Sequence, residues 1–339
     1  RAAGRARGAG MKRARRLRAA FALALLPALA AAEVSETIDR LWNYDDPAAS
    51  EARFRVEAAK APPGSRESLE LQTQIARAQG LQRAFDAAHR TLDAVEAKLE
   101  GAAARVRVRY LLERGRVYNS SGAPERAVPL FTDAASAAAA DPDPGAEFYR
   151  IDALHMLGIA APASSRMSWN QEALRLAERS KDPRARGWRA SLGNNLGWLY
   201  FERGDPSTAL AYWQRALVAR EALGDAHRTR IARWTVARGM RAVGRFDEAQ
   251  AIQMSLAEEL DRTGAPDGYV FEELAELAIA RGDRTAAADW AARALPLLAA
   301  DAGFAAREPG RIARLKELAA TGSPAPASPS RDAVTGKKP

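Results

Sequence analysis

The residue types that most often do chemistry are sparse in this chain of 339 residues. It has three histidines, His89, His155 and His227, and no cysteine. The histidines lie far apart in the sequence, so their spacing does not match a zinc motif. Without cysteine there are no disulfides, no thiolate nucleophiles and no thiolate metal sites. We therefore expect no metal centre.

Carboxylates that could act in pairs as acid and base are also present. Glu258-Glu259 and Glu272-Glu273 are examples, and both fall in helical patterns where a solvated face is the expected environment. The chain contains no phosphate-binding loop, dinucleotide fingerprint or nucleophile elbow. The sequence therefore predicts a protein that is not an enzyme and binds no cofactor.

The net charge of +9 would fit a nucleic-acid-binding protein, but its distribution does not. Residues 1–32 carry eight of the 51 basic residues and no acid, which leaves 43 basic residues against 42 acidic ones in the remainder. A nucleic-acid-binding protein needs its basic surface in the folded part. We therefore expect no nucleic-acid partner.

The basic N-terminal segment has the layout of a secretory signal. A basic stretch starts at Met11, a 14-residue apolar run covers residues 19–32, and small residues precede Glu33. Such a run is shorter than the roughly 20 residues that span a bilayer, so an uncleaved anchor is the alternative. The interpretation is an upstream extension and signal peptide over residues 1–32. It implies a periplasmic or secreted protein with no stable membrane span after cleavage.

The elements that must position any site are helical. Ala, Leu, Arg and Glu favour helices, and the strand-forming runs of Val, Ile and Thr are almost absent. A repeated pattern is clearest in Ser191–Glu221, where Leu196-Gly197 is followed by Tyr200. A turn follows at Gly204-Asp205-Pro206, with Asp205 and Pro206 suited to start the next helix. That helix has small and large residues at fixed spacings: Ala209, Trp213 and Ala216.

The same frame recurs along the chain. Its second-helix alanines are Ala88, Ala127, Ala209, Ala249 and Ala287, which gives a period near 40. This pattern resembles the tetratricopeptide repeat (TPR), whose usual period is 34. The longer period predicts longer helices or linkers, and armadillo/HEAT arrays are the alternative. The resemblance implies an all-α fold, a right-handed α-solenoid of about six TPR-like helical hairpins with short flanking helices.

The flanks of this array differ in composition from the repeats. We expect a leading helical segment over 33–67, the TPR-like array over 68–301 and a capping helix over 302–320. A solenoid needs such a cap to cover its last apolar face. The Pro-, Ser- and Ala-rich residues 321–339 predict a disordered tail.

In the family that this chain resembles, the first helices of the hairpins line a concave groove. The resemblance therefore implies an exported scaffold that binds a protein or peptide partner through that groove. A sensory or regulatory TPR module of a bacterial signalling system is the alternative, and another α-solenoid adaptor is the third. Carried onto this sequence, the groove residues are Arg109, Arg116, Asn119, His155, Asn194, Trp198, Phe201, Trp234, Arg238 and Arg241.

Overall fold

The computed structural model describes residues 37–143 and 145–321. These residues form helices joined by turns, with no β-strand among them, so the all-α prediction is confirmed. The expected signal segment and the expected C-terminal tail lie outside the described residues. No helix within the described ranges combines the length and the apolar character that a membrane crossing requires.

The chain divides into two compact units, and the division falls between Leu192 and Gly193, inside one helix. Unit 1 contains a helical turn over residues 37–41 and the helices up to the first half of α9; unit 2 contains the rest. The helices of unit 1 are α2 Pro47–Ala58, α3 Arg66–Leu81, α4 Phe85–Glu96, α5 Ala104–Ser120, α6 Pro124–Ala140, α7 Ala146–Ala160 and α8 Ala163–Arg179, and α9 Pro183–Glu202 crosses the division. Those of unit 2 are α10 Pro206–Glu221, α11 Ala226–Ala242, α12 Phe246–Thr263, α13 Gly268–Ala280, α14 Arg284–Ala300, α15 Ala302–Arg307 and α16 Pro309–Thr321.

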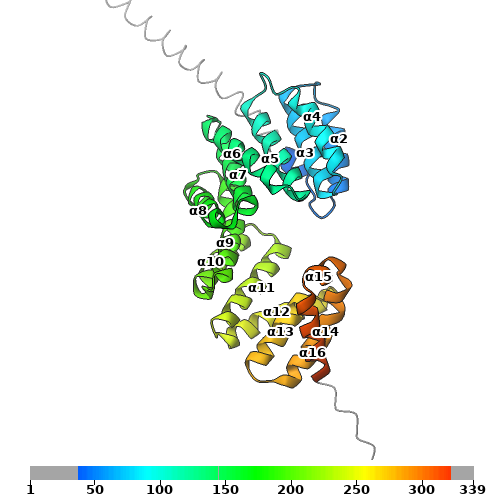
Figure 1. Ribbon diagram of the computed structural model, residues 1–339, viewed down its shortest axis with the longest axis vertical. Helices are drawn as coiled ribbons and strands as arrows, with labels where there is room; N and C mark the ends of the chain where they lie inside the picture. The colour runs from blue at the N-terminus through cyan, green and yellow to red at the C-terminus, as the bar shows by residue number, and fades with distance from the viewer. Residues whose placement is uncertain (1–36, 144, 322–339) are drawn as a thin grey trace, which may run out of the picture. The chain divides into compact units, whose positions relative to one another are not determined.

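Consecutive helices pair as hairpins, visible in Figure 1 as α3 with α4, α5 with α6, α7 with α8, and so on to α13 with α14. The described residues thus hold six hairpins, as expected from the repeat. Paired 17-residue helices such as α5 and α6, with short connections, explain why the period is near 40. We call α3, α5, α7, α9, α11 and α13 the first helices.

Close packing within a hairpin depends on small residues where its two helices cross. A Cβ atom at Gly197 of α9 would lie 2.2 Å from the indole Nε1 of Trp213 on α10, a distance that no real contact allows. The five second-helix alanines that define the period are all fully buried: Ala88, Ala127, Ala209, Ala249 and Ala287. The sequence interpretation of these small positions is confirmed.

The turns inside five of the six hairpins share one backbone geometry, with a residue of positive φ; the α7–α8 turn differs, because it contains Pro162 and no residue of positive φ. In the α9–α10 hairpin, Gly204 has φ +79°, and Asp205 caps α10 by accepting a hydrogen bond from the Thr208 N–H. In the α3–α4 hairpin, Arg83 occupies the equivalent place with φ +62°, which is unfavourable for a residue with a Cβ atom. The two turns also have the same backbone hydrogen bond. The residue that follows Gly204 or Arg83 donates its N–H to the carbonyl five residues earlier: Asp205 to Tyr200, and Ala84 to Gln79.

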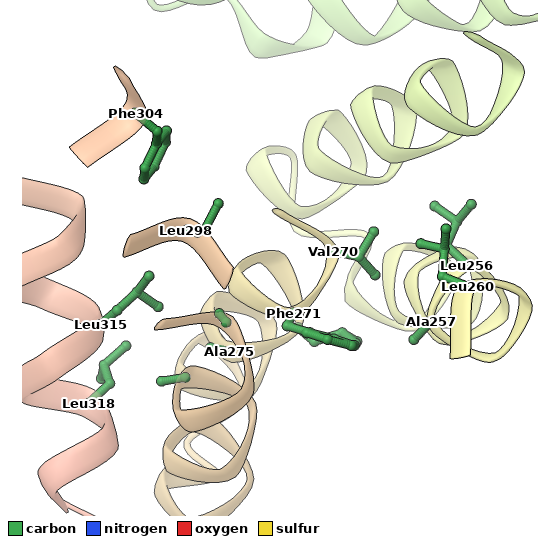
Figure 2. Packing of buried hydrophobic residues seen from close by; sticks show 13 residues of the cluster. Leu256, Ala257, Leu260, Val270, Phe271, Ala275, Leu298, Phe304, Leu315 and Leu318 are labelled. Atoms are coloured by element: carbon green, nitrogen blue, oxygen red, sulfur yellow. The ribbon is translucent and has the colours of Figure 1, made fainter. Parts of the chain in front are cut away.

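The last hairpin of unit 2 is covered by two helices, where the sequence indicated one. Pro309 begins α16, and Glu308 between α15 and α16 has a non-helical backbone. Figure 2 shows Leu315 and Leu318 of α16 and Phe304 of α15 in one cluster with Phe271 of α13. These helices therefore bury the apolar face that the last hairpin would otherwise expose.

The turn geometry makes a prediction about stability. Arg83→Gly should raise the free energy of unfolding by about 0.5–1 kcal/mol, because the left-handed conformation costs a residue with a Cβ atom about 1 kcal/mol or more. Chemical denaturation at neutral pH measures this change.

The matched variant is Gly204→Ala, where an added Cβ atom meets nothing within 4 Å and only the backbone is strained. It should lose about 1 kcal/mol. Equal stability of Arg83→Gly and wild type would contradict this account of the turn.

Candidate functional site

All ten residues expected to line a groove lie on first helices. Arg109, Arg116 and Asn119 are on α5 and His155 is on α7, all in unit 1. The other six lie in unit 2: Asn194, Trp198 and Phe201 on α9, and Trp234, Arg238 and Arg241 on α11.

The two arginines of unit 1 connect successive first helices. Arg109 is only 5% exposed; its Nε lies 3.0 Å from a Glu70 carboxylate oxygen on α3, and it also donates to the Tyr149 hydroxyl on α7. Arg116 contacts Glu113 at 2.6 Å on its own helix and Asp152 at 2.5 Å on α7. These contacts run from α3 through α5 to α7.

The electrostatics of these contacts favour the charged forms. Burial alone would raise the pKa of Asp152, but the adjacent Arg116 outweighs it and holds that pKa below its ordinary value. Burial likewise opposes the charge of Arg116, and the carboxylates of Asp152 and Glu113 overcome it and raise the pKa of Arg116. The arginines are therefore charged and neutralised within the protein.

Unit 2 repeats this arrangement with its own residues. Glu273 on α13 accepts from Arg238 at 2.5 Å and from Arg241 at 2.8 Å, both on α11. Glu272 and Glu276, also on α13, pair with arginines of α16: Arg311 and Arg314. We call these inter-helix pairs of both units the arginine–carboxylate ladder.

The expectation of a solvated face is wrong for one pair of carboxylates. Glu272 is 7% exposed and Glu273 is 1% exposed, because the arginines of the neighbouring helices cover them. The helical pattern placed these residues correctly on α13. Their burial follows from partners about one repeat away, which the local pattern does not contain.

Unit 2 also gathers aromatic residues around one arginine. The guanidinium of Arg238 lies 5.6 Å from the ring centre of Trp234 and 5.8 Å from those of Trp198 and Phe201. The three rings are half-buried. Trp198 and Phe201 pack on the buried Trp213, and Trp234 donates its indole N–H to the Tyr269 carbonyl at 3.0 Å. Five expected groove residues, Trp198, Phe201, Trp234, Arg238 and Arg241, are thus brought together.

The remaining expected residues are not part of that cluster. His155 packs against Trp188 of α9 with ring centres 4.8 Å apart, and burial lowers the pKa of His155 to about 4. Asn119 is half-buried near the end of α5. Asn194 contributes its backbone carbonyl, which accepts from the indole of Trp213. Sequence reasoning missed Trp188 and the acidic partners of the ladder: Glu70, Glu113 and Asp152.

Unit 2 also contains a cavity of about 640 Å³ where α11, α12, α13 and α14 meet. Its walls are mostly apolar, and two of its polar residues, Asp267 and Asp301, already cap helices. Within the described part of the chain, no group of three or more His, Asp or Glu side chains is placed to hold a metal ion. The lining residues are His227, Arg230, Ile231, Trp234, Leu256, Leu260, Ala265, Pro266, Asp267, Gly268, Tyr269, Val270, Leu297, Leu298 and Asp301.

The environment of His155 predicts a pH dependence of stability. Between pH 6.5 and about 4 the unfolded chain gains a proton on His155 that the folded chain does not, so stability falls as pH falls. His155→Phe keeps a ring against Trp188 and removes this proton. From pH 7 to pH 4.5 the wild type should lose about 2 kcal/mol more than the variant in urea unfolding.

The same substitution at the exposed His227 controls for the loss of one histidine. If the free energy of unfolding changes with pH in parallel for wild type and His155→Phe, then His155 binds its proton equally in the folded and unfolded states, and the prediction is wrong.

Comparison with known proteins places the fold. No family model matches the chain, and no curated protein matches its sequence. Among solved structures, apo RapI is similar with a TM-score of 0.61 and 8% identity over 85% of each chain. A Rap protein complexed with competence and sporulation factor has a TM-score of 0.53 and 11% identity, covering 86% of this chain and 88% of that one.

A third similar structure is a Signal Transduction ATPase with Numerous Domains protein from Pyrococcus horikoshii, which has a tetratricopeptide repeat sensor. Its TM-score is 0.60 at 13% identity, covering 82% of this chain and 45% of that one. This chain therefore spans less than half of that protein. At such low identity the likeness shows the fold alone. Together with the six hairpins, it establishes that this chain has a TPR-like all-α fold.

Proposed function

We propose that the chain is a non-catalytic scaffold that binds a protein or peptide partner through its first helices. The observation that carries this proposal is the aromatic–arginine cluster of unit 2, in which Trp198, Phe201 and Trp234 surround Arg238. Tryptophan and arginine are the residue types most enriched where binding energy concentrates in protein interfaces. Half-buried rings offer apolar area to a partner and lose little entropy on binding.

The arginine–carboxylate ladder favours a protein partner and argues against a polyanion such as a nucleic acid. Arg238 and Arg241 share the carboxylate of Glu273, so part of their positive charge is neutralised within the protein. A nucleic acid would gain little there from counterion release. A peptide with mixed apolar and polar side chains matches this surface better. The fold likeness to a Rap protein complexed with competence and sporulation factor is consistent with a binding role.

Export to the periplasm or to the medium is part of the proposal. It is supported by the sequence of residues 11–32, which have the basic start, apolar run and small residues of a secretory signal. The near-neutral composition after residue 32 fits a protein whose basic character belongs to its leader.

Partner capture tests the binding surface. Arg238→Met removes the guanidinium and keeps an apolar stem. If the cluster is an interface hot spot, capture of the partner from envelope extract by the chain from Glu33 onward should fall roughly tenfold. Quantitative mass spectrometry of the captured proteins measures this ratio.

Arg284→Met is the matched control, because Arg284 is exposed on α14, the second helix of its hairpin. It should capture as much partner as wild type, and thermal melting should show that both variants are folded. If Arg238→Met retains every partner of the wild type at the same level, the assignment of this surface is incorrect.

Export is tested by breaking the apolar run. Leu25→Arg should keep the full-length precursor in the cytoplasm, because a charge in the middle of the run opposes insertion. Cell fractionation and intact mass measure the outcome, with Leu25→Val as the control. A precursor of unchanged location and mass would argue against a signal function.

A further inference from the structure

The cavity of unit 2 is open to solvent and has apolar walls. Its volume of about 640 Å³ lies within the range of pockets that hold ligands in proteins. Four of its wall residues are labelled in Figure 2: Leu256 and Leu260 of α12, Val270 of α13 and Leu298 of α14. The exposed members of the lining form its mouth, and they are His227, Ile231, Ala265, Pro266 and Asp301. A ligand can therefore enter from the surface.

The polar groups in the walls mostly have partners within unit 2. Arg230 lies 3.4 Å from a carboxylate oxygen of Glu259 on α12. Asp267 and Asp301 each accept a backbone N–H as helix caps, and the Trp234 indole donates to a backbone carbonyl of α13. What these groups leave for a ligand is mainly apolar area. The part of a ligand that fits the cavity is therefore uncharged.

Trp234 joins the cavity to the aromatic–arginine cluster of the proposed binding surface. Its side chain lines the cavity, and its ring centre lies 5.6 Å from the guanidinium of Arg238. The two residues are four positions apart on α11, which separates them by about 6 Å along the helix axis. An extended peptide advances about 3.3 Å per residue. A peptide that contacts the cluster can therefore place a side chain one or two residues away in the cavity.

The walls of the cavity are held in place by their own packing. The rings of Trp234 and Tyr269 meet edge to face with centres 6.1 Å apart. A Cβ atom at Gly268 would lie 2.7 Å from Cγ of Leu298, so the start of α13 packs directly against α14. A preformed pocket lowers the entropic cost of binding. Water in an apolar pocket has few hydrogen-bond partners, so its displacement by an apolar group favours binding.

We propose that this cavity is the anchor pocket of the binding surface. It takes one or two large uncharged apolar side chains of the bound peptide, such as phenylalanine, tryptophan or leucine. Binding energy in protein interfaces concentrates on large side chains in desolvated pockets of this kind. This inference rests on the proposed peptide-binding function and names the residue class by which the partner is anchored.

Peptide selection tests the anchor pocket. A random peptide display library is panned against the wild-type chain, and enriched peptides are resynthesised with each large apolar residue replaced by alanine. Their affinities are measured by fluorescence polarisation for wild type and two variants at the mouth. Ile231→Gln makes the mouth polar and Ala265→Trp narrows it, and both positions are exposed, so the core is left intact. Val218→Gln is the matched control, because Val218 is 67% exposed on the second helix α10.

The proposal expects enriched peptides that share a large apolar residue. Replacing it by alanine should weaken binding to wild type about tenfold. This factor should be the same in about 0.1 M and about 1 M NaCl, because salt does not screen an uncharged side chain. Ile231→Gln and Ala265→Trp should bind the parent peptide about fivefold more weakly and should reduce the cost of the alanine replacement. Val218→Gln should behave as wild type, and thermal melting checks that each variant is folded.

An uncharged apolar dye, Nile red, tests the same cavity without a peptide. Its fluorescence should rise when it is mixed with the wild-type chain and should rise less with Ile231→Gln and Ala265→Trp. Adding an enriched peptide should lower the fluorescence again, because the anchor side chain and the dye compete for one space. Dye that stays bound in the presence of saturating peptide would assign the cavity to a small apolar molecule and overturn the proposal.

The anchor pocket is also overturned if the alanine replacement costs the same factor in wild type, Ile231→Gln and Ala265→Trp, or if that cost disappears at high salt. If the pocket fails in one of these ways and the peptides still lose affinity in Arg238→Met, the proposed function stands without it. If no peptide is enriched on the wild-type chain, the proposed function fails together with the pocket.

Discussion

The stacking of hairpins in both units depends on arginine–carboxylate pairs between successive first helices. Glu70 and Glu273 are almost completely buried, and a buried carboxylate without a cationic partner would cost several kcal/mol. Arg109 of α5 pairs with Glu70 of α3, and Arg238 and Arg241 of α11 pair with Glu273 of α13. Each ion pair therefore joins two successive first helices and fixes which of their faces meet and in which register. The buried alanines and the aromatic side chains then pack within an arrangement that these charges select.

These ion pairs give the arginines on the first helices a structural role. Arg109 and Arg116 were expected to contact a ligand, and the structure gives them carboxylate or hydroxyl partners within unit 1. The groups that remain for a partner are the half-buried rings around Arg238. Binding would then rest mainly on the apolar area of these rings.

The sequence predicts the hairpins because their signals are local. Gly197 before Trp213, the turn at Gly204 and the cap at Asp205 all lie within one repeat, and each has the predicted role. The ladder was missed because its partners lie 32 to 39 residues apart, as for Arg241 with Glu273 and Arg311 with Glu272. A search for opposite charges one repeat apart could have found Glu273. The ion pair between Asp39 and Arg184 joins residues 145 positions apart and has no such periodic signal, so only the three-dimensional structure reveals it.

In the proposed function, the first helices bind the partner and the second helices support them. Hydrogen–deuterium exchange of the chain with and without its captured partner tests this most directly, because it reports each helix separately. The account predicts added protection on first helices such as α7, α9 and α11, with α6, α10 and α12 unchanged. Protection confined to the second helices would contradict it.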